Sequence, residues 1–167
     1  MVNSLEKFKV WLVCTGNTCR SPMAEGIFKQ LLQEKKVQHF VIFSAGIAAL
    51  EGFAATSQAI DTAKNFGIDI SPHIAKKVTP ERLKEADLIL VMAPEHYQYI
   101  VQLDSNLTSK TYLLKAFPQK EVDEKYLIKD PLGGDDETYY KCFFELEEHI
   151  RRIWPTLLGW SLKKKTA

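Results

Sequence analysis

The feature that most constrains the fold is a run of five apolar residues, Leu88 to Met92, in the middle of the chain. A strand that lacks a polar face is typical of a parallel sheet that helices cover on both faces. Further short apolar runs, which we expect to be strands, lie at residues 8–13, 40–43 and 111–114. Helical patterns separate these runs. This alternation predicts an α/β fold built on a parallel sheet.

The helices are indicated by their spacing and by their first residues. Met23, Ile27 and Leu31 recur at helical intervals, so a helix is expected over residues 22–36 with Ser21 as its N-cap. The last helix is expected to be capped by Asp135 and Asp136 and to end near Trp154 and Pro155. Shorter helices are predicted at residues 56–66, after Thr79 and from Pro94.

Composition and charge exclude several classes of protein. The chain has 167 residues, of which 46% are hydrophobic, so we expect one domain with a sizeable core. A formal net charge of +1 gives no general reason to expect a nucleic-acid partner. No run approaches the roughly 18 apolar residues of a membrane span, and residues 1–9 lack the apolar stretch of a signal peptide. Three cysteines, an odd number, favour free thiols in a reducing cytoplasm.

The turn after the first expected strand has an unusual composition. Between Val13 and Pro22 it reads Cys-Thr-Gly-Asn-Thr-Cys-Arg-Ser, and in open α/β sheets ligands bind at this edge. Gly16 and Asn17 are residue types that accept a positive φ. The loop can therefore turn successive backbone N–H groups inward as an anion-binding nest. The following helix adds free N–H groups and the positive end of its dipole.

Cys14 and Arg20 lie at the two ends of this turn. Five residues separate them, enough for one tight loop around a tetrahedral group. The guanidinium of Arg20 matches two phosphate oxygens, and such positive surroundings lower the pKa of a cysteine to roughly 3.5–7.5. We therefore expect Cys14 to be a thiolate that attacks phosphorus and forms a phosphocysteine, which water then hydrolyses.

The leaving group of such a reaction needs a proton, which a carboxylic acid supplies. Asp130 is a candidate because Pro131 stiffens the chain after it and residues 133–134, both glycine, form a loop. An Asp-Pro pair is nevertheless typical of an ordinary turn, and spacing does not select Asp130. The alternatives that it leaves open are Asp123, Asp135 and Asp136.

The stretch VCTGNTCRSPMAE at residues 13–25 resembles the phosphate loop of the low-molecular-weight protein tyrosine phosphatase family almost residue for residue. The pair Asp130-Pro131 is similar to the general-acid loop of that family. The similarity covers about residues 7–154, in the family's order. The segments that also fit are SAG at residues 44–46, GIDISPH ending at His73 and ADLILVM from Ala86.

This resemblance implies a single phosphatase domain over residues 1–167, with a core at about 7–154 and a C-terminal tail at 155–167. From its charge alone, the run Lys163 to Lys165 is expected to be a solvated tail rather than a membrane or partner patch. The implied fold is a four-stranded parallel twisted sheet with about five helices on its two faces. The implied activity is hydrolysis of phosphotyrosine in a phosphorylated protein or peptide, with inorganic phosphate as product. We expect no metal, no cofactor, no membrane or nucleic-acid partner, and a monomer.

The resemblance also assigns roles by position. Cys14 is the nucleophile, Arg20 binds phosphate and stabilises the transition state, and Asp130 is the general acid and then the base. Ser44 and His73 are implied as hydrogen-bonding supports. The remaining residues of the phosphate site are Thr15, Gly16, Asn17, Thr18, Cys19 and Ser21.

Several of these residues also have simpler interpretations. Ser21 either turns its hydroxyl toward the thiolate or acts only as a helix cap, and both roles can coexist. His73 is either a support or a structural residue of a turn. Cys19 either traps an oxidised Cys14 as a disulfide or is a small packed side chain. Cys142 is interpreted as a core residue.

Two departures from the family bear on the substrate. The residues after the general-acid pair are commonly two tyrosines, whereas here they are Leu132 and Gly133. The other pocket wall falls near Leu50, which is also aliphatic, so stacking worth about 0.5–1.5 kcal/mol per aromatic pair is lost. Thr18 replaces a bulky aliphatic residue, as in the branch that dephosphorylates phosphoarginine. The alternatives are therefore a protein-arginine phosphatase or tolerated variation at Thr18.

Other classes are less consistent with the sequence. An arsenate reductase of this fold needs further cysteines, and none lies between Cys19 and Cys142. A phosphate-binding module without activity would lack the nucleophile or the arginine. A metalloenzyme is disfavoured because the four histidines show no ligand spacing. A nucleotide site is disfavoured because the loop does not end in Gly-Lys-Ser/Thr.

Overall fold

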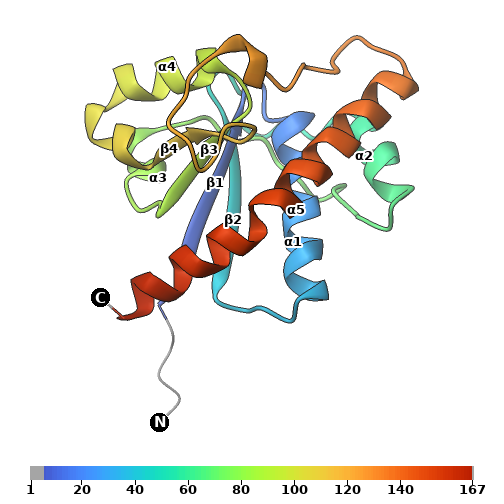
Figure 1. Ribbon diagram of the computed structural model, residues 1–167. Helices are drawn as coiled ribbons and strands as arrows, with labels where there is room; N and C mark the ends of the chain where they lie inside the picture. The colour runs from blue at the N-terminus through green and yellow to red at the C-terminus, as the bar shows by residue number, and fades with distance from the viewer. Residues whose placement is uncertain (1–5, 167) are drawn as a thin grey trace.

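The computed structural model describes residues 6–166. Residue 167 and residues 1–5, part of the stretch considered for a signal peptide, lie outside it. A four-stranded parallel sheet runs through the middle of the molecule (Figure 1). The strand order is β2-β1-β3-β4. The strands are β1 Phe8–Cys14, β2 Phe40–Gly46, β3 Leu88–Val91 and β4 Thr111–Leu113.

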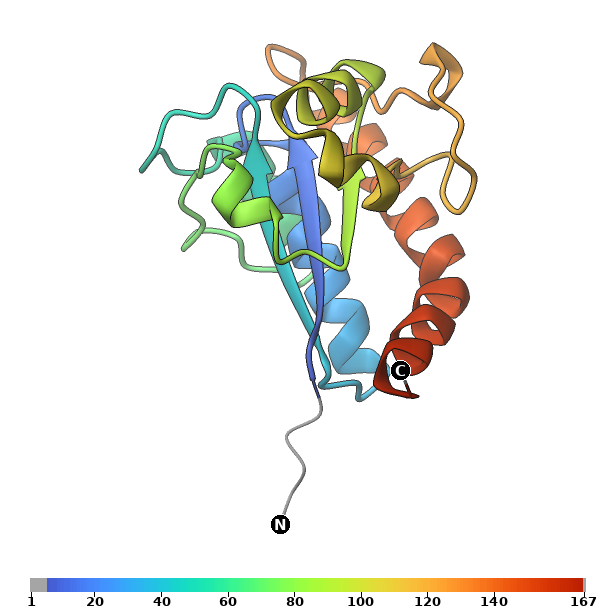
Figure 2. The same cartoon turned by 90° about the vertical axis from the view of Figure 1, so that its left-hand side faces the viewer.

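Helices cover both faces of the sheet, as Figures 1 and 2 show. One face carries α1 Arg20–Glu34, α2 Ser57–Lys64 and α5 Asp136–Thr166. The other face carries α3 Pro80–Leu83 and α4 Pro94–Leu103. Two 3₁₀ helices, η1 Ser105–Lys110 and η2 Glu124–Tyr126, lie in the connections. The predicted single α/β domain with a four-stranded parallel sheet is confirmed.

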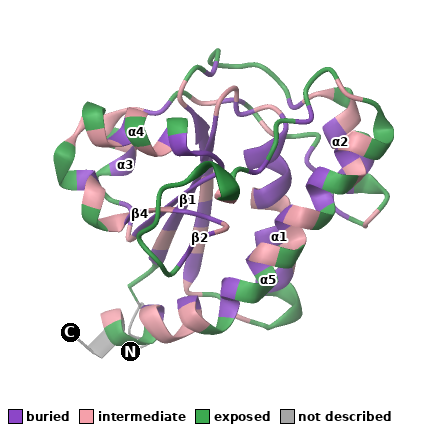
Figure 3. Cartoon of the chain, turned by 45° about the horizontal axis from the view of Figure 1, so that its top comes forward, coloured by how far each residue is buried: buried purple, intermediate pink, exposed green. Residues whose placement is uncertain are grey.

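The alternation of side chains along the strands divides the core into two clusters. Val10 and Leu12 of β1 pack with α1, α2 and α5, whereas Trp11 and Val13 pack with α3 and α4. All four residues of β3 are buried, as its apolar sequence predicted. Figure 3 shows the buried strands beneath helices whose outer faces are exposed. Within residues 6–166, no helix is both long enough and apolar enough to cross a membrane.

The last helix differs from the prediction, because it continues through Pro155 to Thr166. A proline inside a helix removes one backbone hydrogen bond, but the following turns are held by the core. Leu157 is buried, and the Trp160 ring lies 4.9 Å from the Phe117 ring. The Ser161 hydroxyl lies 2.9 Å from His39 Nε2. The tail predicted at residues 155–167 is therefore wrong for residues 155–166.

The lysine run at the end of α5 is also attached to the domain. Lys164 Nζ lies 2.8 Å from Asp87 Oδ1 and 3.1 Å from Glu6 Oε1, so the prediction of a solvated run is wrong for Lys164. These contacts join the last turns of α5 to the segments before β1 and β3. Along its length, α5 crosses the face of the sheet that it shares with α1 and α2 (Figure 1).

Candidate active site

The turn singled out in the sequence, residues 14–20, lies at the carboxyl end of β1 and leads directly into α1. We call it the phosphate loop. Cys14 is the last residue of β1 and pairs with Gly46 at the end of β2. The neighbouring strand β3 ends at the same edge of the sheet. The site therefore lies where open parallel sheets place their ligands.

Asn17 shapes the loop from within. Its φ is 56°, whereas Gly16 does not adopt a positive φ, so the predicted left-handed turn falls on Asn17. The Asn17 side chain is fully buried and donates to Ser21 Oγ at 2.8 Å and to Ser44 Oγ at 3.0 Å. The Lys76 backbone N–H donates to Asn17 Oδ1 at 2.8 Å. One side chain thus fastens the loop to three other segments.

Two further residues support the loop from outside. His73 Nε2 donates to the carbonyl of Asn17 at 2.8 Å, and burial lowers the pKa of His73. Gly46 packs so closely that a Cβ there would lie 2.4 Å from the Thr15 carbonyl oxygen. Ser44 and His73 occupy the hydrogen-bonding positions that the resemblance implied. The need for glycine at residue 46 was missed, and its only signal was the small residue after an apolar strand.

Ser21 does not act as a helix cap. The helix α1 begins at Arg20, and its N-cap, Cys19, makes no side-chain capping bond. The Ser21 hydroxyl instead lies 2.9 Å from Cys14 Sγ and accepts from Asn17 Nδ2. A proline is tolerated at residue 22, in the first turn of α1, because the first N–H groups of a helix have no partner within the helix. Of the two interpretations of Ser21, the structure shows the contact with Cys14.

The pKa of the Cys14 thiol differs from the prediction. Burial is the largest influence and raises this pKa above its usual value. The Arg20 guanidinium, the Ser21 hydroxyl and the backbone N–H groups of Ser21 and Asn17 act in the opposite direction. The expectation of a lowered pKa is wrong in its net direction, because the sulfur is almost completely withdrawn from water.

Arg20 is buried and is held at both ends of its guanidinium. Its Nη1 donates to the carbonyl of Ile128 at 2.8 Å. Its Nη2 donates to Thr15 Oγ1 at 3.2 Å and lies 3.4 Å from Asp130 Oδ2. These contacts place the guanidinium between the phosphate loop and the segment that carries Asp130.

Asp130 lies in a second loop, residues 129–134, which we call the acid loop. The Leu132 N–H donates to Asp130 Oδ1 at 3.1 Å, and the Asp130 side chain is 41% exposed. Asp135 is used differently, because its Oδ1 accepts from the Thr138 N–H at the start of α5, as predicted for a cap. The structure thus selects Asp130 among the candidate carboxylates as the neighbour of Arg20.

A small cavity of about 90 Å³ joins the two loops. Leu132 lines it, whereas Leu50 is exposed and is not among its lining residues. No aromatic side chain lines it. A volume near that of three liquid water molecules, at about 30 Å³ each, suits a small tetrahedral group. The lining residues are Cys14, Thr15, Gly16, Thr18, Cys19, Arg20, Asp130 and Leu132.

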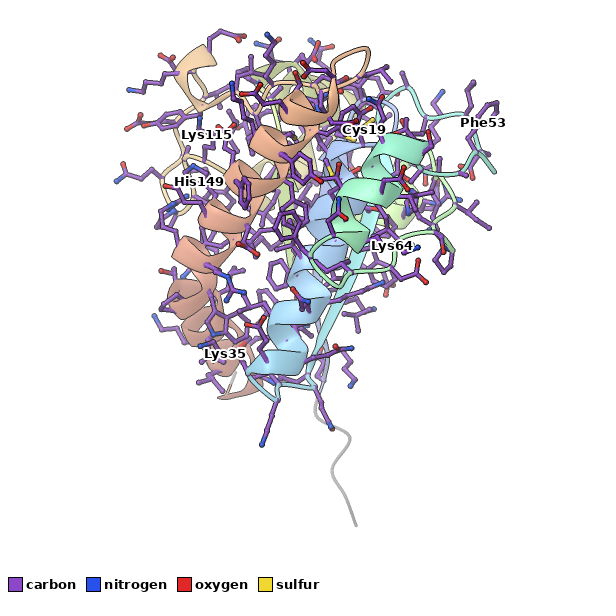
Figure 4. All side chains as sticks on the ribbon, turned by 90° about the vertical axis from the view of Figure 1, so that its right-hand side faces the viewer. Cys19, Lys35, Phe53, Lys64, Lys115 and His149 are labelled. Carbon is purple, nitrogen blue, oxygen red and sulfur yellow. The ribbon has the colours of Figure 1, made fainter. Side chains whose placement is uncertain are left out.

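Cys19 lies at the start of α1, beside α2 and α5, as Figure 4 shows. Its Sγ lies 3.3 Å from the Tyr139 hydroxyl and 3.5 Å from the Thr56 hydroxyl. Cys19 is therefore a packed residue that also lines the cavity. Cys142 is buried in the core, as predicted, and burial raises its pKa to about 12.

His96 is a residue of the site that the sequence did not indicate. It is fully buried in the first turn of α4, and its Nε2 lies 2.9 Å from Thr15 Oγ1. Its only signal was its place just after β3, at the edge of the sheet where Cys14 lies. Among residues 6–166, no group of three or more His, Cys, Asp or Glu side chains is arranged to hold a metal ion.

Comparisons with known proteins agree with this geometry. A family model described as low molecular weight phosphotyrosine protein phosphatase matches residues 9–166. A low molecular weight protein-tyrosine-phosphatase of Acinetobacter johnsonii is 41% identical over 117 residues, which are 70% of this chain and 79% of that protein. A protein-arginine-phosphatase of Bacillus subtilis is 34% identical over 141 residues, 84% of this chain and 91% of that protein.

The fold is also similar to solved structures. The crystal structure of a low molecular weight protein tyrosine phosphatase from T. tengcongensis superposes with a TM-score of 0.81 at 40% identity. The superposition covers 90% of this chain and 99% of that one. The sequence and the fold therefore resemble the same group of proteins over nearly the whole domain.

Proposed function

The chain belongs to the low molecular weight phosphotyrosine protein phosphatase family, and on that premise we propose that it hydrolyses phosphorylated side chains of proteins through a phosphocysteine on Cys14. One observation carries the proposal. Cys14, Arg20 and Asp130 line a single small cavity at the end of β1. A nucleophile, a clamp for phosphate oxygens and an acid thus surround one volume of the size of a phosphoryl group.

In the first step, the Cys14 sulfur attacks phosphorus while the bond from phosphorus to the leaving atom breaks. Asp130 gives its proton to that leaving atom, so a phenol departs as a neutral group and an arginine departs as its guanidinium cation. Arg20 and the backbone N–H groups of the loop hold the phosphoryl oxygens as charge spreads over them. The product of this step is a phosphocysteine and an ionised Asp130.

In the second step, a water molecule attacks phosphorus and gives a proton to Asp130. The bond between sulfur and phosphorus breaks, inorganic phosphate is released, and Cys14 leaves as a thiolate. The Ser21 hydroxyl, 2.9 Å from that sulfur, donates to the thiolate and eases its departure. Asp130 is then protonated again and ready for the next turnover.

The raised pKa of the Cys14 thiol agrees with this scheme. Two complexes of enzyme and substrate carry the same net charge: a thiol with a phosphate dianion, and a thiolate with a phosphate monoanion. They differ only in whether the proton lies on sulfur or on a phosphoryl oxygen. Transfer of the thiol proton to a phosphoryl oxygen therefore produces the nucleophile without the help of solvent. Arg20, held within the site, stabilises either arrangement.

Phosphotyrosine is the first candidate substrate, because it is the substrate in the family's description. Phosphoarginine is a second candidate that a specific observation favours. Thr18 lines the cavity, and no aromatic side chain does. The Thr18 hydroxyl can bind a phosphoramidate or the attacking water. Once Asp130 has given up its proton, its carboxylate attracts the departing guanidinium cation. The Bacillus subtilis relative is described as a protein-arginine-phosphatase.

The test compares kcat/KM for a phosphotyrosine peptide and a phosphoarginine peptide in EDTA. We expect release of phosphate by the wild-type protein and none by Cys14→Ser. Release that persists in Cys14→Ser would contradict the phosphocysteine. Thr18→Ile is then compared with Thr18→Ser, which keeps the hydroxyl. A fall of about tenfold in the ratio of phosphoarginine to phosphotyrosine rates for Thr18→Ile alone assigns specificity to that hydroxyl. An unchanged ratio would remove Thr18 from the argument.

A further inference from the structure

His96 lies against the phosphate loop but has no part in the reaction steps above. Its side chain is fully buried, and its Nε2 lies 2.9 Å from Thr15 Oγ1. Its Nδ1 is buried and makes no hydrogen bond with the described part of the chain. The nearest carboxylate oxygen, Glu95 Oε1, lies 3.6 Å from Nε2, beyond hydrogen-bonding distance. An imidazole with this one contact calls for a functional reason, because buried polar atoms are nearly always satisfied.

The unpartnered nitrogen indicates which tautomer is present. A buried N–H group without an acceptor is rarer in proteins than an unused lone pair. Nδ1 therefore carries the lone pair, and Nε2 carries the hydrogen and donates to Thr15 Oγ1. Burial and the Arg20 guanidinium lower the pKa of His96 to about 3, so the ring is neutral under ordinary conditions. A neutral ring is what this tautomer requires.

The hydroxyl of Thr15 then has two donors directed at it. Arg20 Nη2 donates to Thr15 Oγ1 at 3.2 Å, and His96 Nε2 donates to the same oxygen. A hydroxyl oxygen accepts two hydrogen bonds and donates one. With both lone pairs occupied, the hydroxyl hydrogen has to find another acceptor. Thr15 lines the cavity that Cys14 and Arg20 share.

We propose that His96 is a positioning residue that acts through Thr15. By orienting the Thr15 side chain, it directs the hydroxyl hydrogen of Thr15 toward the phosphoryl group in the cavity and holds the Arg20 guanidinium in place. This inference rests on the proposed function, since it concerns the same phosphoryl group. The chain of contacts runs from α4 through Thr15 to Arg20, so the face of the sheet opposite α1 supports the site as well. A preorganised donor acts where charge develops during phosphoryl transfer.

The experiment uses para-nitrophenyl phosphate as substrate and inorganic phosphate as competitive inhibitor. Thr15→Val removes the hydroxyl at nearly constant shape, and His96→Leu removes the nitrogen that orients it. We expect each to lower kcat by about 10- to 100-fold and to weaken inhibition by phosphate. His96→Gln, which can return an N–H donor near the position of Nε2, is expected to recover most of the loss. Glu95→Gln is the matched control and is expected to keep the wild-type kcat.

The decisive comparison is the double variant. If His96 acts through Thr15, His96→Leu adds less than about threefold in kcat when Thr15 is already valine. The inference would be overturned if the losses in kcat of the two single variants multiply in the double variant, or if His96→Leu keeps the wild-type kcat. If His96→Leu does not fold, a wild-type kcat and phosphate inhibition in Thr15→Val would overturn it instead. Failure of the proposed function is distinguished because it appears as turnover that does not depend on Cys14.

Discussion

The phosphate loop and the acid loop face each other across one cavity, yet they are built in opposite ways. In the phosphate loop, Cys14, Asn17, Cys19 and Arg20 are buried. Asn17 alone makes hydrogen bonds with the Ser44 hydroxyl, the His73 ring and the Lys76 backbone N–H. In the acid loop, Asp130 and Leu132 are exposed. Few hydrogen bonds hold its tip, such as the one from the Gly134 N–H to the Pro131 carbonyl.

This difference separates two tasks of a phosphatase. The phosphoryl group is the same in every substrate, so its donors gain from being held rigidly before the substrate arrives. The leaving group differs from one substrate to another. In the proposed mechanism it meets the acid loop, which has few buried contacts and is of the kind that opens most easily. We therefore expect damage to the phosphate loop to affect all substrates alike and damage to the acid loop to depend on the leaving group.

The largest effect that tests this comparison is expected for Asp130→Asn. Loss of the acid should lower kcat by about 10²- to 10⁴-fold for phenyl phosphate, a poor leaving group, and much less for para-nitrophenyl phosphate. The measurement is kcat over a series of aryl phosphates. Asp135→Asn, which removes a carboxylate outside the cavity and keeps an oxygen that accepts from the Thr138 N–H, is the matched control. A loss of equal size for all leaving groups would mean that Asp130 serves the phosphoryl group.

The next largest effect is expected for Gly46→Ala, which alters the packing against the phosphate loop. A Cβ there would lie 2.4 Å from the Thr15 carbonyl oxygen, so the loop has to shift. We expect a loss of about 1–3 kcal/mol in the free energy of unfolding and a lower kcat for every substrate by a similar factor. Urea unfolding and the same aryl series measure both. Gly159→Ala is the control, because a Cβ there meets nothing within 4 Å. A wild-type kcat in Gly46→Ala would contradict the rigidity of the loop.

A smaller effect concerns the pH dependence of stability. The pKa of His96 is about 3 in the folded chain, below the usual value of about 6.5, so the unfolded chain binds more protons between these values. Its contribution to stability is complete above pH 6.5 and is lost as the pH falls. The slope is about 1.4 kcal/mol per pH unit, or about 2 kcal/mol from pH 6.5 to 5. The measurement is urea unfolding of the wild type and of His96→Gln at pH 6.5 and pH 5. Equal losses in the free energy of unfolding for the two proteins would contradict the prediction.

The smallest effect is expected for Gly133→Ala in the acid loop. Gly133 has a φ of 81°, but a Cβ there would meet nothing within 4 Å. The cost in the free energy of unfolding is therefore only that of the left-handed backbone, about 1–2 kcal/mol, and kcat should change by less than about threefold. The measurement is the steady-state kcat of Gly133→Ala, compared with that of Gly46→Ala. A loss in kcat as large as that of Gly46→Ala would show that both loops are equally rigid.

Much of the fold follows from patterns that are local in the sequence. The four strands and the starts of α2, α3, α4 and α5 lie close to their predicted positions, because apolar spacing and capping residues act within a few neighbours. Of the two residues expected to accept a positive φ, Asn17 adopts one and Gly16 does not. The loop sequence, with its cysteine and arginine at fixed spacing, indicated the edge of the sheet where the structure has a small cavity.

The features that sequence reasoning missed depend on distant partners. The end of α5 was placed at Pro155, but Leu157 and later residues are held by the core. Gly46 is required by the Thr15 carbonyl of the phosphate loop, and His96 meets Thr15 across 81 positions of the chain. The net pKa of Cys14 depends on how completely the fold buries the sulfur, which no local pattern reveals.

The anchoring of Arg20 has a consequence for how activity arises during synthesis. The carbonyl that holds its guanidinium belongs to Ile128, 108 residues further along the chain. A ribosome that adds roughly 5–20 residues per second makes Arg20 about 5–22 s before Ile128. A nascent chain interrupted in that interval contains the thiol and the arginine, but lacks the carbonyl that holds the arginine in place. A fragment that ends before Ile128 therefore lacks one of the contacts that position the Arg20 guanidinium.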